Sequence, residues 1–146
     1  HQRSVFHRLS VFAGGWTLNA AIAIAGDDTD GPDALLDNIA SLVDASLIGF
    51  DPHASHSPRY GMLETIREFA LESLSADGHE GETRDRHAAW CAELVDACWP
   101  PRAAAPASNT ALRQIEVERD NLRAALHWTI LRGDSTTALR VSAGLA

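Results

Sequence analysis

The stretch Arg59–Ala70, RYGMLETIREFA, decides the fold of this chain. Its first four residues read as an extended strand, and from Leu63 onward apolar residues recur at helical spacing to about Ala76. Gly78 follows as a stop signal for this helix. The sequence therefore predicts a strand over 59–62 that runs without a loop into a helix over 63–76. Its expected inward face carries Ile66, Phe69, Ala70 and Leu74.

Three short helices and a hairpin are predicted upstream of this stretch. Apolar spacing places the helices over Ser4–Ala13, Leu18–Ala25 and Pro32–Ala45. Thr17 is a suitable N-cap for the second helix, and Gly26 a suitable stop. Leu47–Phe50 alternates briefly, and the turn-forming stretch Asp51–Pro58 separates it from the strand at 59–62. This order predicts a helix-turn-helix core followed by a β-hairpin.

The rest of the chain is predicted to be helical. Periodic apolar residues indicate helices over Glu82–Trp99, Leu112–Leu131 and Thr136–Ala146. The last two form an expected antiparallel pair, turning at Gly133 and Asp134. Because fewer than three such pairs cannot bury a continuous core, the chain is expected to be a fragment of a longer helical array. The predicted domains are 1–78, and 79–146 with a linker helix and the start of that array.

Three motifs in order resemble one protein family. RLSVFAGGW (Arg8–Trp16), LVDASLI (Leu42–Ile48) and RYGMLETIREFA look like the segment that follows the nucleotide-binding core in STAND-class ATPases. The actinobacterial AfsR/LuxR-like transcriptional regulators are the most similar branch. The resemblance implies a mainly α fold: a winged helix with a small two-stranded β-hairpin, followed by antiparallel TPR-like helices. It also implies an ATPase core before His1.

The same resemblance implies where nucleotide would be sensed in the parent protein. Many STAND proteins carry Met-His-Asp at the start of the helix after the wing, and the histidine senses the β-phosphate of ADP. The corresponding residues here are Met62, Leu63 and Glu64. Leu63 cannot donate a hydrogen bond to phosphate, so it is expected in the core. Leu63, Glu64 and Arg67 remain the weak cofactor-binding candidates for a full-length protein that uses ATP or ADP with magnesium, although a solvated Glu64–Arg67 pair is the simpler expectation.

The distribution of charged residues argues against DNA binding by this segment, and the absence of lysine argues against ATP hydrolysis. The 146 residues carry a net charge of −8, and their twelve cations are all arginines. No cation lies between Arg8 and Arg59, a span that holds seven aspartates: Asp27, Asp28, Asp30, Asp33, Asp37, Asp44 and Asp51. The third helix therefore lacks cations that neutralise phosphate or read guanine. Without lysine there is no G-x-x-x-x-G-K-[ST] phosphate loop, so the segment is not expected to be an enzyme.

No metal or catalytic site is predicted. His53 with His56, and His87 with Cys91, each supply half of a zinc site, with no third ligand at suitable spacing. Cys91 and Cys98 are seven residues apart on one helix, about 10.5 Å between Cα atoms, which is too far for a disulfide. Glu64 and Glu68 share a helix face, where a solvated pair is expected rather than acid–base chemistry.

These observations lead to one functional interpretation and one alternative. The chain is expected to be a non-catalytic segment of a cytoplasmic transcriptional regulator. It would couple an intramolecular nucleotide-binding core to a helical sensor array, while another domain binds DNA. The alternative is direct DNA binding by the winged helix. No apolar run approaches the roughly 20 residues of a membrane span, and no signal peptide is recognised.

Overall fold

A computed structural model describes residues 1–26, 31–54, 57–99 and 108–146. Residues 27–30, 55–56 and 100–107, which include His56 and the aspartates at 27, 28 and 30, lie outside this part. The chain divides into two compact units, His1–Thr83 and Arg84–Ala146. Each is considered separately.

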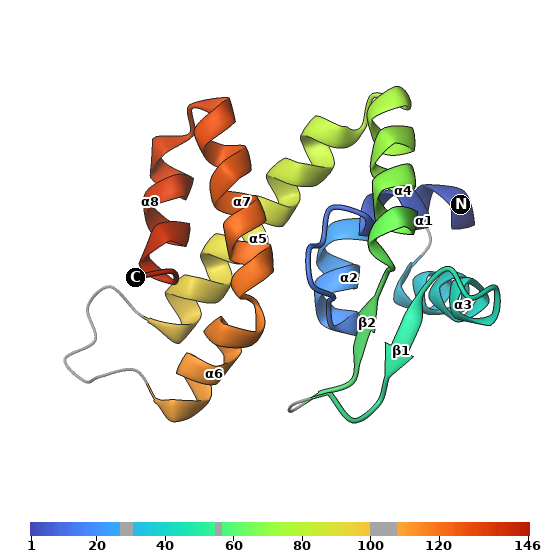
Figure 1. Cartoon of the computed structure of the whole chain (residues 1–146), viewed down its shortest axis with the longest axis horizontal. Coiled ribbons are helices and arrows are strands. Elements are labelled where there is room, and N and C mark those ends of the chain that lie inside the picture. Colours follow the sequence, from blue (N-terminus) through green and yellow to red (C-terminus); the bar gives the residue numbers. More distant parts are fainter. Residues whose placement is uncertain (27–30, 55–56, 100–107) are drawn as a thin grey trace. The chain divides into compact units, whose positions relative to one another are not determined.

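The first unit is a three-helix core with a hairpin and a fourth helix (Figure 1). Its elements are α1 (Gln2–Leu9), α2 (Leu18–Ala25), α3 (Gly31–Asp44), β1 (Gly49–Asp51), β2 (Arg59–Gly61) and α4 (Glu64–Ala76). α1 packs against α2, α3 and α4. The predicted bounds of α2 are confirmed, because the Thr17 side chain accepts a hydrogen bond from the Ala20 amide at 3.3 Å and Gly26 ends the helix.

The predicted hairpin is confirmed and forms a small wing. β1 and β2 pair antiparallel, with Phe50 opposite Tyr60 and Asp51 opposite Arg59. Trp16 adds an isolated bridge on the other edge of β2. Its amide donates to the Tyr60 carbonyl at 2.9 Å, and the Tyr60 amide donates back at 2.8 Å. The wing is thereby tied to the segment between α1 and α2, a connection that the sequence did not indicate.

The predicted burial of α4 is partly wrong. Ala70 and Leu74 are buried and Ile66 is half-buried, but Phe69 is 63% exposed and Leu63, the N-cap residue, is 71% exposed. On a helix, positions 66, 70 and 74 follow one stripe, and position 69 lies about 100° away from position 70. The buried stripe of α4 therefore runs through positions 66, 70 and 74 and does not include Phe69.

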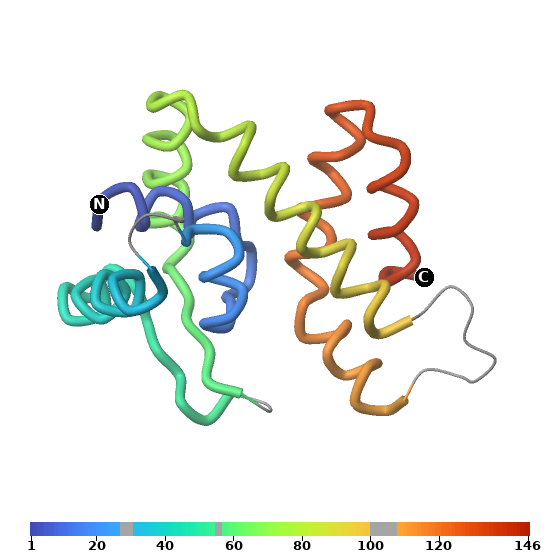
Figure 2. The backbone as a smooth tube through the Cα atoms, turned by 180° about the vertical axis from the view of Figure 1, so that it is seen from behind, coloured from blue at the N-terminus to red at the C-terminus, as the bar shows by residue number. Residues whose placement is uncertain are grey.

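The second unit is helical in its described part (Figure 2). α5 (Glu80–Cys98) starts within the last residues of the first unit and continues into the second, which also contains α6 (Asn109–Val117), α7 (Arg119–Arg132) and α8 (Ser135–Ala143). α7 and α8 pack as an antiparallel hairpin that turns at Gly133, in the left-handed conformation. The prediction of one helix over Leu112–Leu131 is wrong, because the helix breaks at Glu118.

The core of the second unit is small and well defined. Cys91, Val95, Leu122 and Val141 are buried at its centre, with Trp90 and Trp128 packed against them. No helix among the described residues has both the length and the apolar character needed to cross a bilayer.

Candidate nucleic-acid interface

The outer face of α3 is acidic. Leu35, Ile39 and Leu42 turn inward and are buried. Asp33, Asp37 and Asp44 are exposed, and their positions in the helix place all three within about 40° of one another. α3 contains no lysine or arginine. In a helix-turn-helix protein this is the surface that would face a DNA groove, and here it would repel the phosphates.

The wing carries an aromatic pair and one arginine, Arg59. The rings of Phe50 and Tyr60 lie 4.9 Å apart between centroids, and Phe50 is about half exposed. In the turn, the Asp51 side chain accepts a hydrogen bond from the His53 amide at 2.9 Å. Arg59 is paired with Asp51 in the strand register, at the end of the hairpin next to the turn.

The charge of the chain is concentrated in the first unit. Residues 1–83 contain thirteen acidic residues and four arginines, a net charge of −9, whereas residues 84–146 contain seven and eight, a net charge of +1. The unit that has the winged geometry is therefore the one that carries the negative charge.

Glu64 and Arg67, two of the three candidate nucleotide-binding residues, are hydrogen-bonded to each other at the start of α4. Arg67 donates to Glu64 through Nε at 3.1 Å and through Nη2 at 2.8 Å, and its Nη1 donates to the Ser10 carbonyl at 3.2 Å. The hydrogen bond from Arg67 lowers the pKa of the Glu64 carboxyl. Arg67 thus connects α4 to the end of α1. The expectation that Leu63 lies in the core is wrong, because its side chain is exposed.

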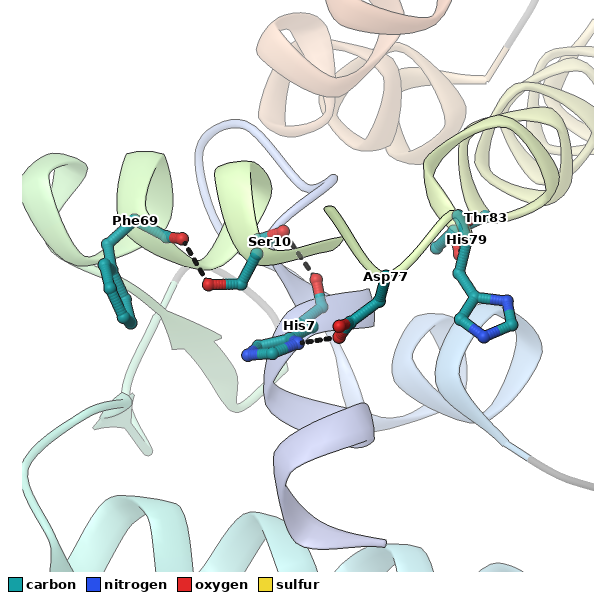
Figure 3. Close-up of polar contacts among 7 residues, drawn as sticks. His7, Ser10, Phe69, Asp77, His79 and Thr83 are labelled. Atoms are coloured by element: carbon teal, nitrogen blue, oxygen red, sulfur yellow. Dashed lines mark hydrogen bonds and ion pairs between the residues drawn. The ribbon is translucent and has the colours of Figure 1, made fainter. Parts of the chain in front are cut away.

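A second link between α1 and α4 was not predicted. His7 is buried, and its Nδ1 lies 3.0 Å from Oδ2 of Asp77, just beyond α4 (Figure 3). The Ser10 hydroxyl donates to the His7 carbonyl. His7 and Asp77 are 70 residues apart. No local spacing rule joins them, so the sequence held no signal for this contact.

The histidine–cysteine pair of α5 is also brought together, inside the second unit. His87 Nε2 and Cys91 Sγ are 3.8 Å apart and buried. Burial lowers the pKa of His87 to about 4 and raises the pKa of the Cys91 thiol. Over the described part of the chain no three histidine, cysteine or acidic side chains gather as metal ligands would. Cys91 and Cys98 are free thiols.

Comparisons with known proteins give a family match within the first unit and two relatives that align with almost the whole chain. Residues 1–75 match the family model described as a winged helix-turn-helix domain. The chain is 37% identical over 148 residues to the "Putative HTH-type transcriptional regulator Rv0890c" of Mycobacterium tuberculosis and, equally, to Mb0914c of Mycobacterium bovis, which bears the same description. These alignments cover 99% of this chain and 16% of each relative.

A shorter alignment matches a relative with a different description. The "Uncharacterized protein Rv0894" of Mycobacterium tuberculosis is 36% identical over 78 residues, which is 53% of this chain and 20% of that protein. No solved structure matches the chain.

Proposed function

Because the chain belongs to the winged helix-turn-helix domain family, we propose that it is a non-catalytic regulatory segment of a larger, cytoplasmic HTH-type transcriptional regulator. The observation that carries this proposal is the family match over residues 1–75, together with the wing that the structure builds from β1 and β2. The two relatives named as regulators are about six times longer than the matched segment, so the rest of such a protein would supply the other activities.

Direct DNA binding by the winged helix is one candidate role. The family description and the names of the relatives support it better than they support a coupling role, because both refer to helix-turn-helix regulators and neither refers to an ATPase. In this mode α3 would enter the major groove, and the wing would contact the adjacent backbone.

Coupling between domains is the second candidate, and the charge of α3 favours it. Asp33, Asp37 and Asp44 occupy the face that would meet DNA, without a cation to anchor phosphate. In this mode residues 1–78 would contact a STAND-type nucleotide-binding core, residues 79–146 would begin a TPR-like sensor array, and DNA would be bound by another domain.

One binding measurement separates the two roles. We expect the chain to show no measurable affinity for a random-sequence DNA duplex at physiological salt, because α3 offers no counterion release. Fluorescence anisotropy with a labelled duplex tests this. The matched variant Asp37→Arg/Asp44→Arg places two cations on the same face and should gain salt-sensitive binding if the winged geometry is competent. Salt-sensitive micromolar binding by the unaltered chain would establish the DNA-binding role instead.

The proposed nucleotide-binding core implies a second expected result. The chain alone should not bind ADP, since it has no lysine and no phosphate loop, and Arg67 is already engaged by Glu64 and Ser10. Isothermal calorimetry with ADP and magnesium should give no binding isotherm. A clear isotherm would mean that the segment itself holds nucleotide.

A further inference from the structure

The solvent-facing side of α3 combines apolar residues with an acidic edge. Leu36 is 42% exposed, Ala40 is exposed and Val43 is half-buried. At 100° per residue these three lie within about 60° of one another. A helix face of this kind suits a partner helix that carries both apolar residues and cations. We call it the acidic strip of α3, and it consists of Asp33, Leu36, Asp37, Ala40, Val43 and Asp44.

α7 presents a face of the opposite charge. Arg119 and Arg123 are exposed. Ile130 is 64% exposed, and Leu126 is half-buried. Helix geometry places these four residues within about 60° of one another, turned away from the buried Ala125. The four together are called the basic strip of α7.

One acidic residue borders the basic strip. Asp120 Oδ1 lies 4.0 Å from Nη1 of Arg123, and both side chains are exposed. An ion pair so open to solvent contributes little to stability. Arg123 can therefore leave Asp120 for the carboxylate of a partner at small cost, and both arginines of the strip are available for an intermolecular contact.

The two strips match in length and in the spacing of their charges. Each covers eleven residue steps, about 16 Å along its helix. Asp33 and Asp37 are four residues apart on α3. Arg119 and Arg123 have the same spacing on α7. With the two helices side by side and parallel, each of these aspartates can face an arginine while the apolar parts of the strips lie next to each other.

We propose that the acidic strip of α3 in one copy of this chain binds the basic strip of α7 in a second copy. The unit charges of −9 and +1 favour this pairing, whereas two α3 strips in contact would bring the aspartates of both copies together. Because the two surfaces differ, the contact is heterologous and leaves one free strip at each end, so that further copies add head to tail. This self-association goes beyond the proposed regulatory role and requires neither DNA nor nucleotide.

Sedimentation equilibrium of the unaltered chain measures this association. We expect the average mass to rise with concentration and to pass that of a dimer. The Kd should be on the order of 100 μM, because a single helix–helix contact is smaller than a standard protein interface. A chain that stays monomeric up to about 1 mM would overturn the proposal and exclude a second copy as the partner of these strips.

Reversing the charge of one strip at a time tests which surfaces meet. Asp33→Arg/Asp37→Arg and Arg119→Glu/Arg123→Glu should each weaken self-association by at least about 10-fold, because two attractive pairs become repulsive. An equimolar mixture of the two variants should associate again, since the reversed α3 strip of one variant meets the reversed α7 strip of the other. A mixture that remains monomeric would rule out this contact.

A matched control separates the contact from the effect of net charge. Glu68→Arg/Glu72→Arg changes the net charge by the same amount as the α3 variant, at two exposed positions of α4. Its self-association should equal that of the unaltered chain. A loss as large as that of Asp33→Arg/Asp37→Arg would mean that overall charge, and not the strip, controls the association.

A second measurement does not depend on the folding of any variant. In a dilution series of the unaltered chain followed by amide NMR, the resonances that shift with concentration should belong to both α3 and α7. Shifts confined to only one of these helices, or located on α4 or α8 instead, would contradict the head-to-tail contact.

Discussion

Replacing Trp16 with alanine should lower the free energy of unfolding of the winged unit by about 3–5 kcal/mol, the usual cost of truncating a buried aromatic residue. Trp16 is 1% exposed and stacks on Phe12 with 5.4 Å between ring centroids. Its backbone also forms the bridge to Tyr60 that fastens the wing. The loss would be a large part of the 5–15 kcal/mol that holds a typical domain together. Urea denaturation followed by far-UV circular dichroism measures it.

Two further variants make this test specific. Phe69→Ala removes an aromatic residue of the same unit that is 63% exposed, and it should change stability by no more than about 0.5 kcal/mol. Trp16→Phe keeps a ring against Phe12, and the indole Nε1 that it deletes has no hydrogen-bond partner among the described residues. It should therefore cost less than alanine. Similar losses for Trp16→Ala and Phe69→Ala would mean that the inward face of α4 is misassigned.

Local signals were sufficient to predict the architecture of the winged unit. Thr17 and Gly26 delimit α2 because a cap and a stop act within one turn of their own position. The hairpin was predictable because two short extended runs flank a stretch rich in turn-forming residues. The Glu64–Arg67 pair was predictable for the same reason, since residues three apart on a helix are neighbours.

Features decided by distant packing could not be predicted. Phe69 and Ala70 both fit an apolar stripe on α4, and α4 packs against α1 with Ala70 buried and Phe69 exposed. The break at Glu118 falls where the side chains of Glu118 and Asn121 are both buried and hydrogen-bonded to each other. The His7–Asp77 contact joins residues 70 positions apart. In each case the local sequence is compatible with several arrangements, and burial selects one.

Replacing Gly15 with alanine should also destabilise the winged unit, here through backbone strain and a close contact. Gly15 has φ +88°, in the left-handed region that residues with a Cβ rarely occupy. A Cβ at this position would lie 2.7 Å from the Tyr60 carbonyl oxygen, the atom that accepts the hydrogen bond of the Trp16 amide. We expect Gly15→Ala to lower the free energy of unfolding by about 2–4 kcal/mol, from backbone strain and overpacking together.

Gly78→Ala separates these two contributions. Gly78 also has a left-handed backbone, with φ +77°, but a Cβ there would meet nothing within 4 Å. Its replacement should therefore cost only the backbone strain, about 1 kcal/mol. The difference between the two variants in urea denaturation gives the contribution of the close approach between Gly15 and β2. Because that approach brings the Trp16 amide to Tyr60, Gly15→Ala should also raise hydrogen exchange at the Trp16 and Tyr60 amides, whereas Gly78→Ala should leave both protected. Equal losses of stability, with both amides unchanged, would mean that the close approach of Gly15 to Tyr60 does not maintain the bridge between Trp16 and β2.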